Sequence, residues 1–97
     1  MKKNQYGMPL MGLGTFDRTG SAGIDAILTA LEIGYRHIDT AQTYDTEREC
    51  GEALRRSGLK REDVFVTTKI STENFGPGML APSLRQSLDR LGLDQVD

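Results

Sequence analysis

The sequence predicts an α/β fold built on parallel strands. Two observations carry this prediction: short β-branched or aromatic segments alternate with longer segments whose apolar residues recur at helical spacing, and glycines stand where the helical segments end. Repeated βα units imply parallel strands joined by right-handed crossovers. The order of segments fits either an open doubly wound sheet or the start of an eight-stranded barrel, and periodicity alone does not choose between them.

The first 16 residues are expected to form a β-hairpin followed by a short strand. Tyr6-Gly7 is typical of a turn, and Met8–Phe16 is typical of a glycine-studded strand. Gly12 and Gly14 suggest a dinucleotide-binding loop, but Asp17 stands where the third glycine would be and no helix opens there. We therefore expect a strand whose glycines let a neighbour or a ligand approach the backbone.

The rest of the chain alternates between helical and extended patterns. The expected elements are a helix from Ser21 to about Ile33, a strand over Tyr35–Thr40, a helix from Thr46 that ends at Gly58, a strand over Val64–Ile70, a helix over residues 80–91, and the opening of a further strand at Gln95–Asp97.

The helix starts carry recognisable capping residues. Ser21 is expected to cap the first helix, and Thr46 with Glu49 matches the capping box of the second. Cys50 lies on the apolar side of that second helix, so it is expected to be packed and unreactive.

Composition restricts the class of protein. The chain has 97 residues, a net charge of −2 and one cysteine, with acidic and basic residues interspersed. A nucleic-acid surface would need a concentrated basic patch, and a membrane span would need a long apolar run. We therefore expect a cytoplasmic protein with no nucleic-acid or membrane partner and no disulfide.

Three chemistry-bearing residues are expected to meet at one end of the sheet. Asp39 and Lys69 lie at the carboxyl ends of consecutive strands, and Tyr44 lies in the loop after the first of them. A phenol is a weak acid at neutral pH, an ammonium group beside it stabilises the phenolate, and a carboxylate keeps the ammonium charged. Such a group can donate a proton to a carbonyl oxygen as hydride arrives at the carbon.

Each of these residues also has an ordinary structural interpretation. Asp39 alone could cap a loop, Tyr44 could be a surface aromatic, and Lys69 could be a solvated strand end. His37 shares a face with Asp39 and is expected to be a hydrogen-bonded packing residue. No second His or Cys stands at metal-ligand spacing, so no metal site is expected.

At these residues the sequence resembles the aldo-keto reductases, and most of all the branch of bacterial 2,5-diketo-D-gluconate and methylglyoxal reductases. The matching segments are Met8–Phe16, Ala30–Ala41 with Tyr44, Arg61–Lys69 and Ser87–Asp97. The resemblance implies a (β/α)8 TIM barrel whose amino-terminal end is closed by the hairpin. It also implies NADPH bound in extended form without a Rossmann domain, and a small aldehyde or ketone as substrate.

The resemblance also implies residue roles. Tyr44 would be the general acid, tuned by Lys69 and Asp39, and Asp39 would also hold the nicotinamide ribose. Gly14 and Thr15 would lie beside the cofactor. Phe16 and Tyr44 would line the substrate pocket. Thr46 and Cys50 replace the Asn and the aliphatic residue that are more usual in the family.

Residues 1–97 would be the amino-terminal third of such a barrel. The family's catalytic histidine would lie beyond Asp97, so the isolated chain is expected to be inactive. An alternative is a non-catalytic barrel fragment that acts through self-association of open strand edges or through a partner. A redox-sensing relative that couples to a partner protein is a third interpretation.

Overall fold

A three-stranded parallel sheet forms the centre of the molecule, which the computed structural model describes over residues 2–97. The strands are β1 (Leu13–Gly14), β2 (His37–Asp39) and β3 (Phe65–Thr67), in the spatial order β1-β2-β3. Asp39 pairs with Gly14 on one side and with Thr67 on the other. The α/β class and the parallel pairing expected from the repeated βα units are therefore confirmed.

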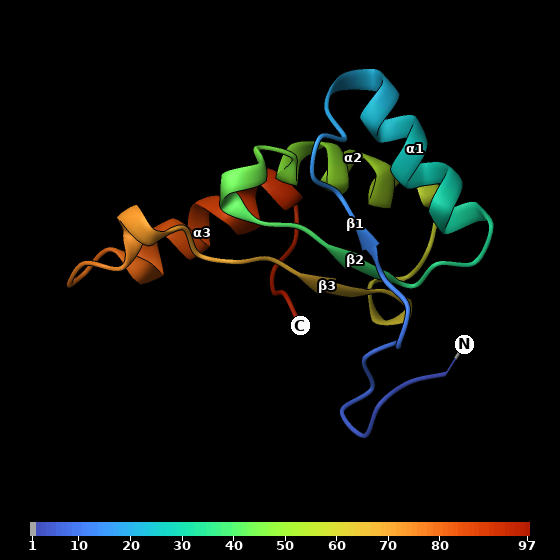
Figure 1. Cartoon of the computed structure of the whole chain (residues 1–97), viewed down its shortest axis with the longest axis horizontal. Helices are drawn as coiled ribbons and strands as arrows, with labels where there is room; N and C mark the ends of the chain where they lie inside the picture. The colour runs from blue at the N-terminus through green and yellow to red at the C-terminus, as the bar shows by residue number, and fades with distance from the viewer. Residues whose placement is uncertain (1) are drawn as a thin grey trace.

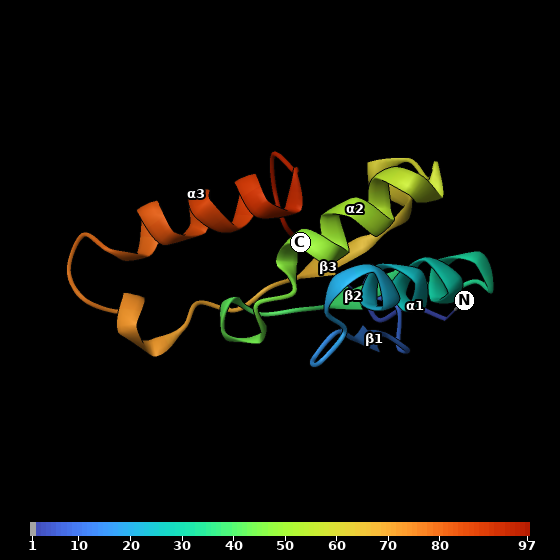
Figure 2. The ribbon, with the colours of Figure 1, turned by 90° about the horizontal axis from the view of Figure 1, so that it is seen from above.

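Three helices connect and cover these strands. They are α1 (Gly20–Glu32), α2 (Glu47–Ser57) and α3 (Leu80–Leu91), with short 3-10 turns η1 (Gln42–Tyr44), η2 (Arg61–Asp63) and η3 (Thr72–Asn74) between them. Helix α1 packs on α2, and α2 packs on α3 (Figure 2). Figure 1 shows the helices on one side of the sheet, with the chain before β1 extending away from them.

The core lies between the sheet and the helices. Strand β2 buries Ile38 and strand β3 buries Val66, while their neighbours at alternate positions are partly exposed. This is the period-two pattern of a sheet that is covered on one face. The buried cluster takes side chains from every helix and comprises Ile27, Leu31, Ile38, Cys50, Ala53, Val64, Val66 and Leu91.

The expected elements are present, with strands shorter than the sequence pattern. The hairpin is confirmed by an antiparallel bridge between Lys3 and Pro9. Helices α2 and α3 end at Gly58 and Gly92, whose φ angles of 70° and 69° are left-handed. Glycine adopts this conformation without the steric cost that a side chain brings.

The expected helix caps are wrong. Helix α1 begins at Gly20, and neither Thr19 at its N-cap nor Thr46 at the N-cap of α2 makes a side-chain capping hydrogen bond. The Thr46 hydroxyl instead contacts the hydroxyl of Thr15, and Glu49 accepts a hydrogen bond from the backbone N–H of Gly20 at 3.0 Å. Tertiary partners from β1 and α1 therefore replace the local bonds that a capping box would supply.

The last residues pair with β3 without forming an assigned strand. The Asp97 N–H donates to the Val66 carbonyl at 2.9 Å, and the Val66 N–H donates to Asp97 Oδ2 at 2.9 Å. Arg61 Nη2 lies 2.7 Å from the same carboxylate oxygen. The pairing agrees with the expected position of a further strand, although over residues 2–97 the sheet itself has three strands.

None of the helices formed by residues 2–97 has both the length and the apolar character that crossing a bilayer requires.

Candidate active site

The carboxyl end of the sheet brings together three of the residues that the sequence singled out. Asp39 is the last residue of β2, Lys69 follows β3 by two residues, and Tyr44 ends the turn η1. Lys69 Nζ lies 2.7 Å from Asp39 Oδ1 and donates a hydrogen bond to the Tyr44 hydroxyl at 3.1 Å. The expected tyrosine, lysine and aspartate therefore form one continuous polar contact.

Lysine 69 is held in its charged form. Its ammonium group is paired first with the Asp39 carboxylate and then with the Tyr44 hydroxyl, and together these raise the pKa of Lys69 above its ordinary value of 10.5, although partial desolvation opposes the shift. The side chains of Lys69 and Asp39 are 48% and 41% exposed, so the pair faces an open surface. A ligand can therefore approach the three groups from solvent.

An aromatic residue stands beside the polar group. Phe16, just after β1, meets the Tyr44 ring edge-to-face with 5.5 Å between centroids. Phe16 is 64% exposed, so it offers an apolar surface next to the Tyr44 hydroxyl. The expected role of Phe16 in lining a substrate pocket stays a prediction.

The two residues before Phe16 are placed differently from one another. Gly14 is exposed, and a Cβ added there would meet no heavy atom within 4 Å, so the backbone lies open. Thr15 is 0% exposed, and its hydroxyl contacts the hydroxyls of Thr40 at 2.8 Å and Thr46 at 2.9 Å. The Thr15 side chain is therefore buried just after β1, and its expected position beside the cofactor stays a prediction.

His37 is a packing residue, as expected. Its Nε2 lies 3.1 Å from the Thr67 hydroxyl, and its ring meets that of Phe65 edge-to-face. Gly12 gives the ring its space, because a Cβ at that position would lie 2.7 Å from His37 Nδ1. Gly12, just before β1, therefore makes room for a neighbouring side chain, whereas the space around Gly14 is open.

Glu47 is a site-supporting residue that the sequence analysis missed. It is only 2% exposed, accepts a hydrogen bond from the Thr68 hydroxyl at 2.6 Å, and pairs with Arg90 Nη2 at 2.8 Å. Thr68 directly precedes Lys69, so the buried Glu47 carboxylate holds the chain just after β3. A glutamate in the first turn of a helix is ordinarily read as a dipole-compensating residue, which hid this role.

Gln42 was missed for a different reason. Its side-chain amide joins η1 to the segment after Lys69 and to α3, with partners far away in the sequence. A single glutamine in a loop has no local signal, and only its place inside the segment between Ala41 and Tyr44 could have drawn attention to it.

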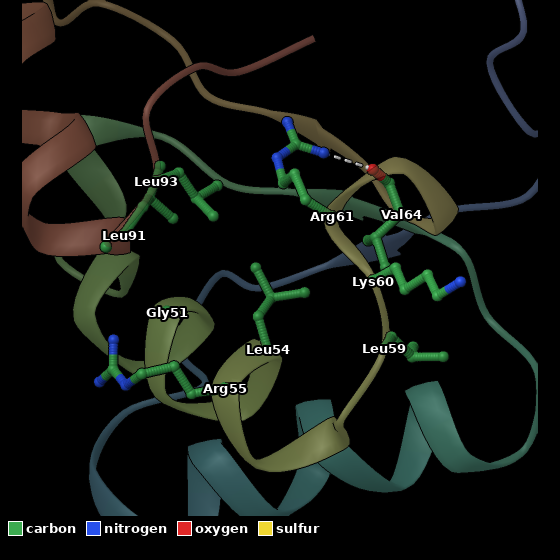
Figure 3. A pocket seen from close by; sticks show the side chains of 10 residues that line it. Gly51, Leu54, Arg55, Leu59, Lys60, Arg61, Val64, Leu91 and Leu93 are labelled. Atoms are coloured by element: carbon green, nitrogen blue, oxygen red, sulfur yellow. Dashed lines mark hydrogen bonds between the residues drawn. The ribbon is translucent and has the colours of Figure 1, made fainter.

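An apolar pocket lies elsewhere on the molecule. A pocket of about 180 Å³ opens between α2, residues 59–64 and the end of α3, and is lined mainly by leucines and by the stems of Arg55, Lys60 and Arg61 (Figure 3). None of Asp39, Tyr44 and Lys69 lines it. It lies by the residues that enter β3, whereas Asp39 and Lys69 stand where β2 and β3 end.

Metal-ligating side chains do not cluster in the described part of the chain. Over residues 2–97, no three side chains of His, Cys, Asp or Glu gather in a way that could hold a metal ion. The groups that converge are an acid–base pair and an aromatic, and they suit proton donation to an oxygen atom.

Comparison with known proteins finds related sequences over most of the chain. The chain is 47% identical over 90 residues to the methylglyoxal reductase DkgB of Salmonella typhimurium, a match that covers 93% of this chain and 34% of that protein. It is 48% identical over 91 residues to the glycerol 2-dehydrogenase (NADP(+)) of Saccharomyces cerevisiae, covering 93% and 28%. The chain therefore spans about a third of the length of the curated relatives it matches.

Solved structures give the same result. An aldo-keto reductase from a Medee basin deep-sea metagenome library superimposes with a TM-score of 0.89 and 44% identity, covering 93% of this chain and 33% of that one. A Bombyx mori aldo-keto reductase in complex with NADP gives 0.86 and 35%, covering 96% and 34%. These structure neighbours imply a (β/α)8 barrel, of which the present sheet and helices correspond to one part.

The model of the aldo/keto reductase family matches residues 10–97, which include β1, β2, β3 and all three converging side chains. This chain belongs to the aldo/keto reductase family.

Proposed function

We propose that residues 1–97 form the amino-terminal third of an NADPH-dependent reductase of small aldehydes and ketones. The contact that carries the proposal is the hydrogen bond of 3.1 Å from Lys69 Nζ to the Tyr44 hydroxyl. The same Nζ lies 2.7 Å from Asp39 Oδ1. It supports a role for Tyr44 as the proton donor to the substrate oxygen. Lys69 stabilises the phenolate that remains, and Asp39 orients the lysine.

The cofactor part of the proposal rests on the edge of the site beside β1. Gly14 leaves an open backbone and Asp39 is partly exposed, which supports the proposal that a nicotinamide ribose binds over the ends of β1 and β2. When bound, the nicotinamide supplies hydride to the carbonyl carbon. Thr15 fixes the end of β1 through its buried hydroxyl, and Phe16 lines the substrate side. Two relatives carry NADP in their names, which favours the same cofactor here.

A chimaera tests this proposal. The chain replaces the matching third of the Salmonella typhimurium DkgB, and reduction of methylglyoxal is followed by the loss of NADPH absorbance. We expect the chimaera to turn over, and Tyr44→Phe to lower kcat by about 1,000-fold or more while NADPH affinity changes less than about twofold. Tyr6→Phe is the matched control, because Tyr6 is 79% exposed in the hairpin.

Two results would reject the proposal. A chimaera that is folded by circular dichroism, binds NADPH and does not reduce methylglyoxal would remove the assigned chemistry. A Tyr44→Phe variant as active as Tyr6→Phe would remove Tyr44 from the reaction. A cytoplasmic location remains part of the proposal and is checked by fractionation of cells expressing the protein.

Self-association of the isolated chain is the alternative. Leu10, Met11 and Phe75 are more than half exposed, and β1 is an outer strand of the described sheet, whereas Val66 of the other outer strand, β3, already pairs with Asp97. Apolar surface beside a strand edge favours pairing with another copy. Size-exclusion chromatography with NADPH fluorescence distinguishes the two views, because a monomeric 97-residue chain that binds NADPH tightly would contradict assembly as the chain's role.

A further inference from the structure

Gln42 occupies an unusual position for a loop glutamine. It opens the turn η1 that ends at Tyr44, and its backbone N–H donates to the Lys69 carbonyl at 3.1 Å. The main chain of Gln42 therefore contacts the main chain of the residue whose side chain meets Tyr44. Any shift of Gln42 therefore moves Tyr44 and Lys69 relative to one another.

The side-chain oxygen of Gln42 holds the segment that follows Lys69. Oε1 accepts hydrogen bonds from the Ser71 N–H at 2.8 Å, from the Ser71 hydroxyl at 3.1 Å and from Asn74 Nδ2 at 3.0 Å. Ser71 is only 5% exposed, so its N–H has lost water and depends on this acceptor. The segment over residues 71–74 is thereby fastened to the Tyr44 turn.

The side-chain nitrogen of Gln42 holds helix α3. Nε2 donates to the Ser83 carbonyl at 3.2 Å and to the Ser87 hydroxyl at 3.0 Å. Ser83 and Ser87 are 4% and 0% exposed. Because the Ser83 carbonyl can only accept and the Ser71 N–H can only donate, the amide has one orientation that satisfies both. A carboxylate cannot replace it, since it has no proton for Ser83.

We propose that Gln42 is a positioning residue, which fixes Tyr44 against Lys69 by tying η1 to residues 71–74 and to α3 at once. This inference rests on the proposed reductase function for its catalytic consequence. Gln42 does not touch the reacting atoms in this scheme. It acts through Lys69, whose charged state depends on its distance from Asp39, and through the turn that carries the phenol.

The test compares Gln42→Glu with Gln86→Glu. The first keeps the size of the side chain and its acceptor oxygen but removes both donors to α3. The second makes the same chemical change at an exposed position of α3, so it controls for the added charge. Both variants are made in the 97-residue chain and in the DkgB chimaera, and thermal unfolding checks that each is folded.

Hydrogen exchange provides a readout that needs no activity. We expect amide exchange at Ser71 to rise by about tenfold or more in Gln42→Glu and to stay within about twofold in Gln86→Glu. In the chimaera we expect kcat to fall by roughly 100-fold in Gln42→Glu, as for a misplacement of about 1 Å, while the Kd for NADPH stays within about twofold.

The outcomes separate the two proposals. Raised exchange with an unchanged kcat would show that Gln42 fastens the loop without positioning the acid, and would overturn the inference, as would two variants that behave alike. A wild-type chimaera without activity would sink the reductase proposal instead. The rate of amide exchange at Ser71 would then be the only measurement that decides whether Gln42 holds residues 71–74.

Discussion

Lys69 Nζ lies 3.1 Å from the Tyr44 hydroxyl although the two residues are 25 positions apart in the chain. The contact exists because β2 and β3 are neighbours and end at the same edge of the sheet. Asp39 ends β2 at the same edge, and its Oδ1 lies 2.7 Å from Lys69 Nζ. The acid–base character of the site therefore depends on strand pairing as much as on residue type.

Removing the Asp39 charge is expected to lower the pKa of Lys69. The carboxylate is the leading cause that raises this pKa above 10.5, so Asp39→Asn should return it toward that ordinary value. Because the pKa of Lys69 is raised in the folded state, its pairing with Asp39 stabilises the fold fully below pH 10.5. This stabilisation is lost as the pH rises through the raised pKa. A side-chain NMR titration of Lys69 measures the shift. Asp94→Asn, at an exposed position, should leave it unchanged.

Removing the Lys69 charge should affect turnover more than cofactor binding. Lys69→Met in the DkgB chimaera is expected to lower kcat by about 100-fold or more, because the phenolate left by proton transfer loses its ammonium neighbour. Steady-state kinetics and an NADPH fluorescence titration give the two quantities. Lys60→Met is the control, since Lys60 is an exposed lysine that precedes η2. Equal losses in both variants would contradict the assignment.

Replacing Gly12 or Gly14 by alanine should affect stability to very different extents. Gly12→Ala places a Cβ 2.7 Å from His37 Nδ1, in a ring already held by Thr67 and Phe65, and should lower the free energy of unfolding by about 1–3 kcal/mol. Gly14→Ala meets nothing within 4 Å and should change it by less than about 0.5 kcal/mol. Urea denaturation of both variants measures the difference. In the chimaera, Gly14→Ala should weaken NADPH binding, because the cofactor is proposed to approach there.

The buried Glu47 should contribute more to stability than the more exposed Glu52 of the same helix. Glu47→Ala leaves Arg90 and Thr68 without their partner and is expected to cost about 3 kcal/mol. Glu52 pairs with Arg55 and Arg56 on the surface of α2, so Glu52→Ala should leave the unfolding transition nearly unchanged. Similar urea midpoints for both variants would show that the buried pair contributes nothing.

Cys50 should be inert in the folded chain. It is 0% exposed, and burial is the main cause that raises the pKa of its thiol above 9.0. A thiol reagent at pH 7 should therefore label the protein only as fast as it opens, and completely in urea. Rapid stoichiometric labelling of the native chain would contradict the packing seen here.

Much of the fold was predictable because local signals pointed to the same elements. Leucines at helical spacing predicted α3, Gly58 and Gly92 marked helix ends, and Val64–Ile70 contained β3. Caps were mispredicted for a physical reason. A hydroxyl at a helix start can bond to its own backbone or to a tertiary partner, and only the packed structure shows that Thr46 meets Thr15.

The candidate site was predictable to the same extent. Asp39, Tyr44 and Lys69 could be named because strand ends, loop position and the chemistry of a phenol beside an ammonium are all readable in order along the chain. Thr15 was expected beside the cofactor together with Gly14, and only the packed structure shows that its side chain is buried against Thr40 and Thr46. Gln42 and Glu47 carried no local signal, since their partners come from α3 and from the residues after β3.

The sequence by itself determined which residues can supply acid–base chemistry, the βα order that places two of them at strand ends, and the family to which the chain belongs. The tertiary structure decided the 2.7 Å and 3.1 Å contacts of Lys69, the burial of Thr15 and Glu47, and the six hydrogen bonds that Gln42 makes across three segments. Local pattern encodes how each segment folds on itself. Which polar atoms lose water, and which distant partners compensate them, is set only when the segments pack together.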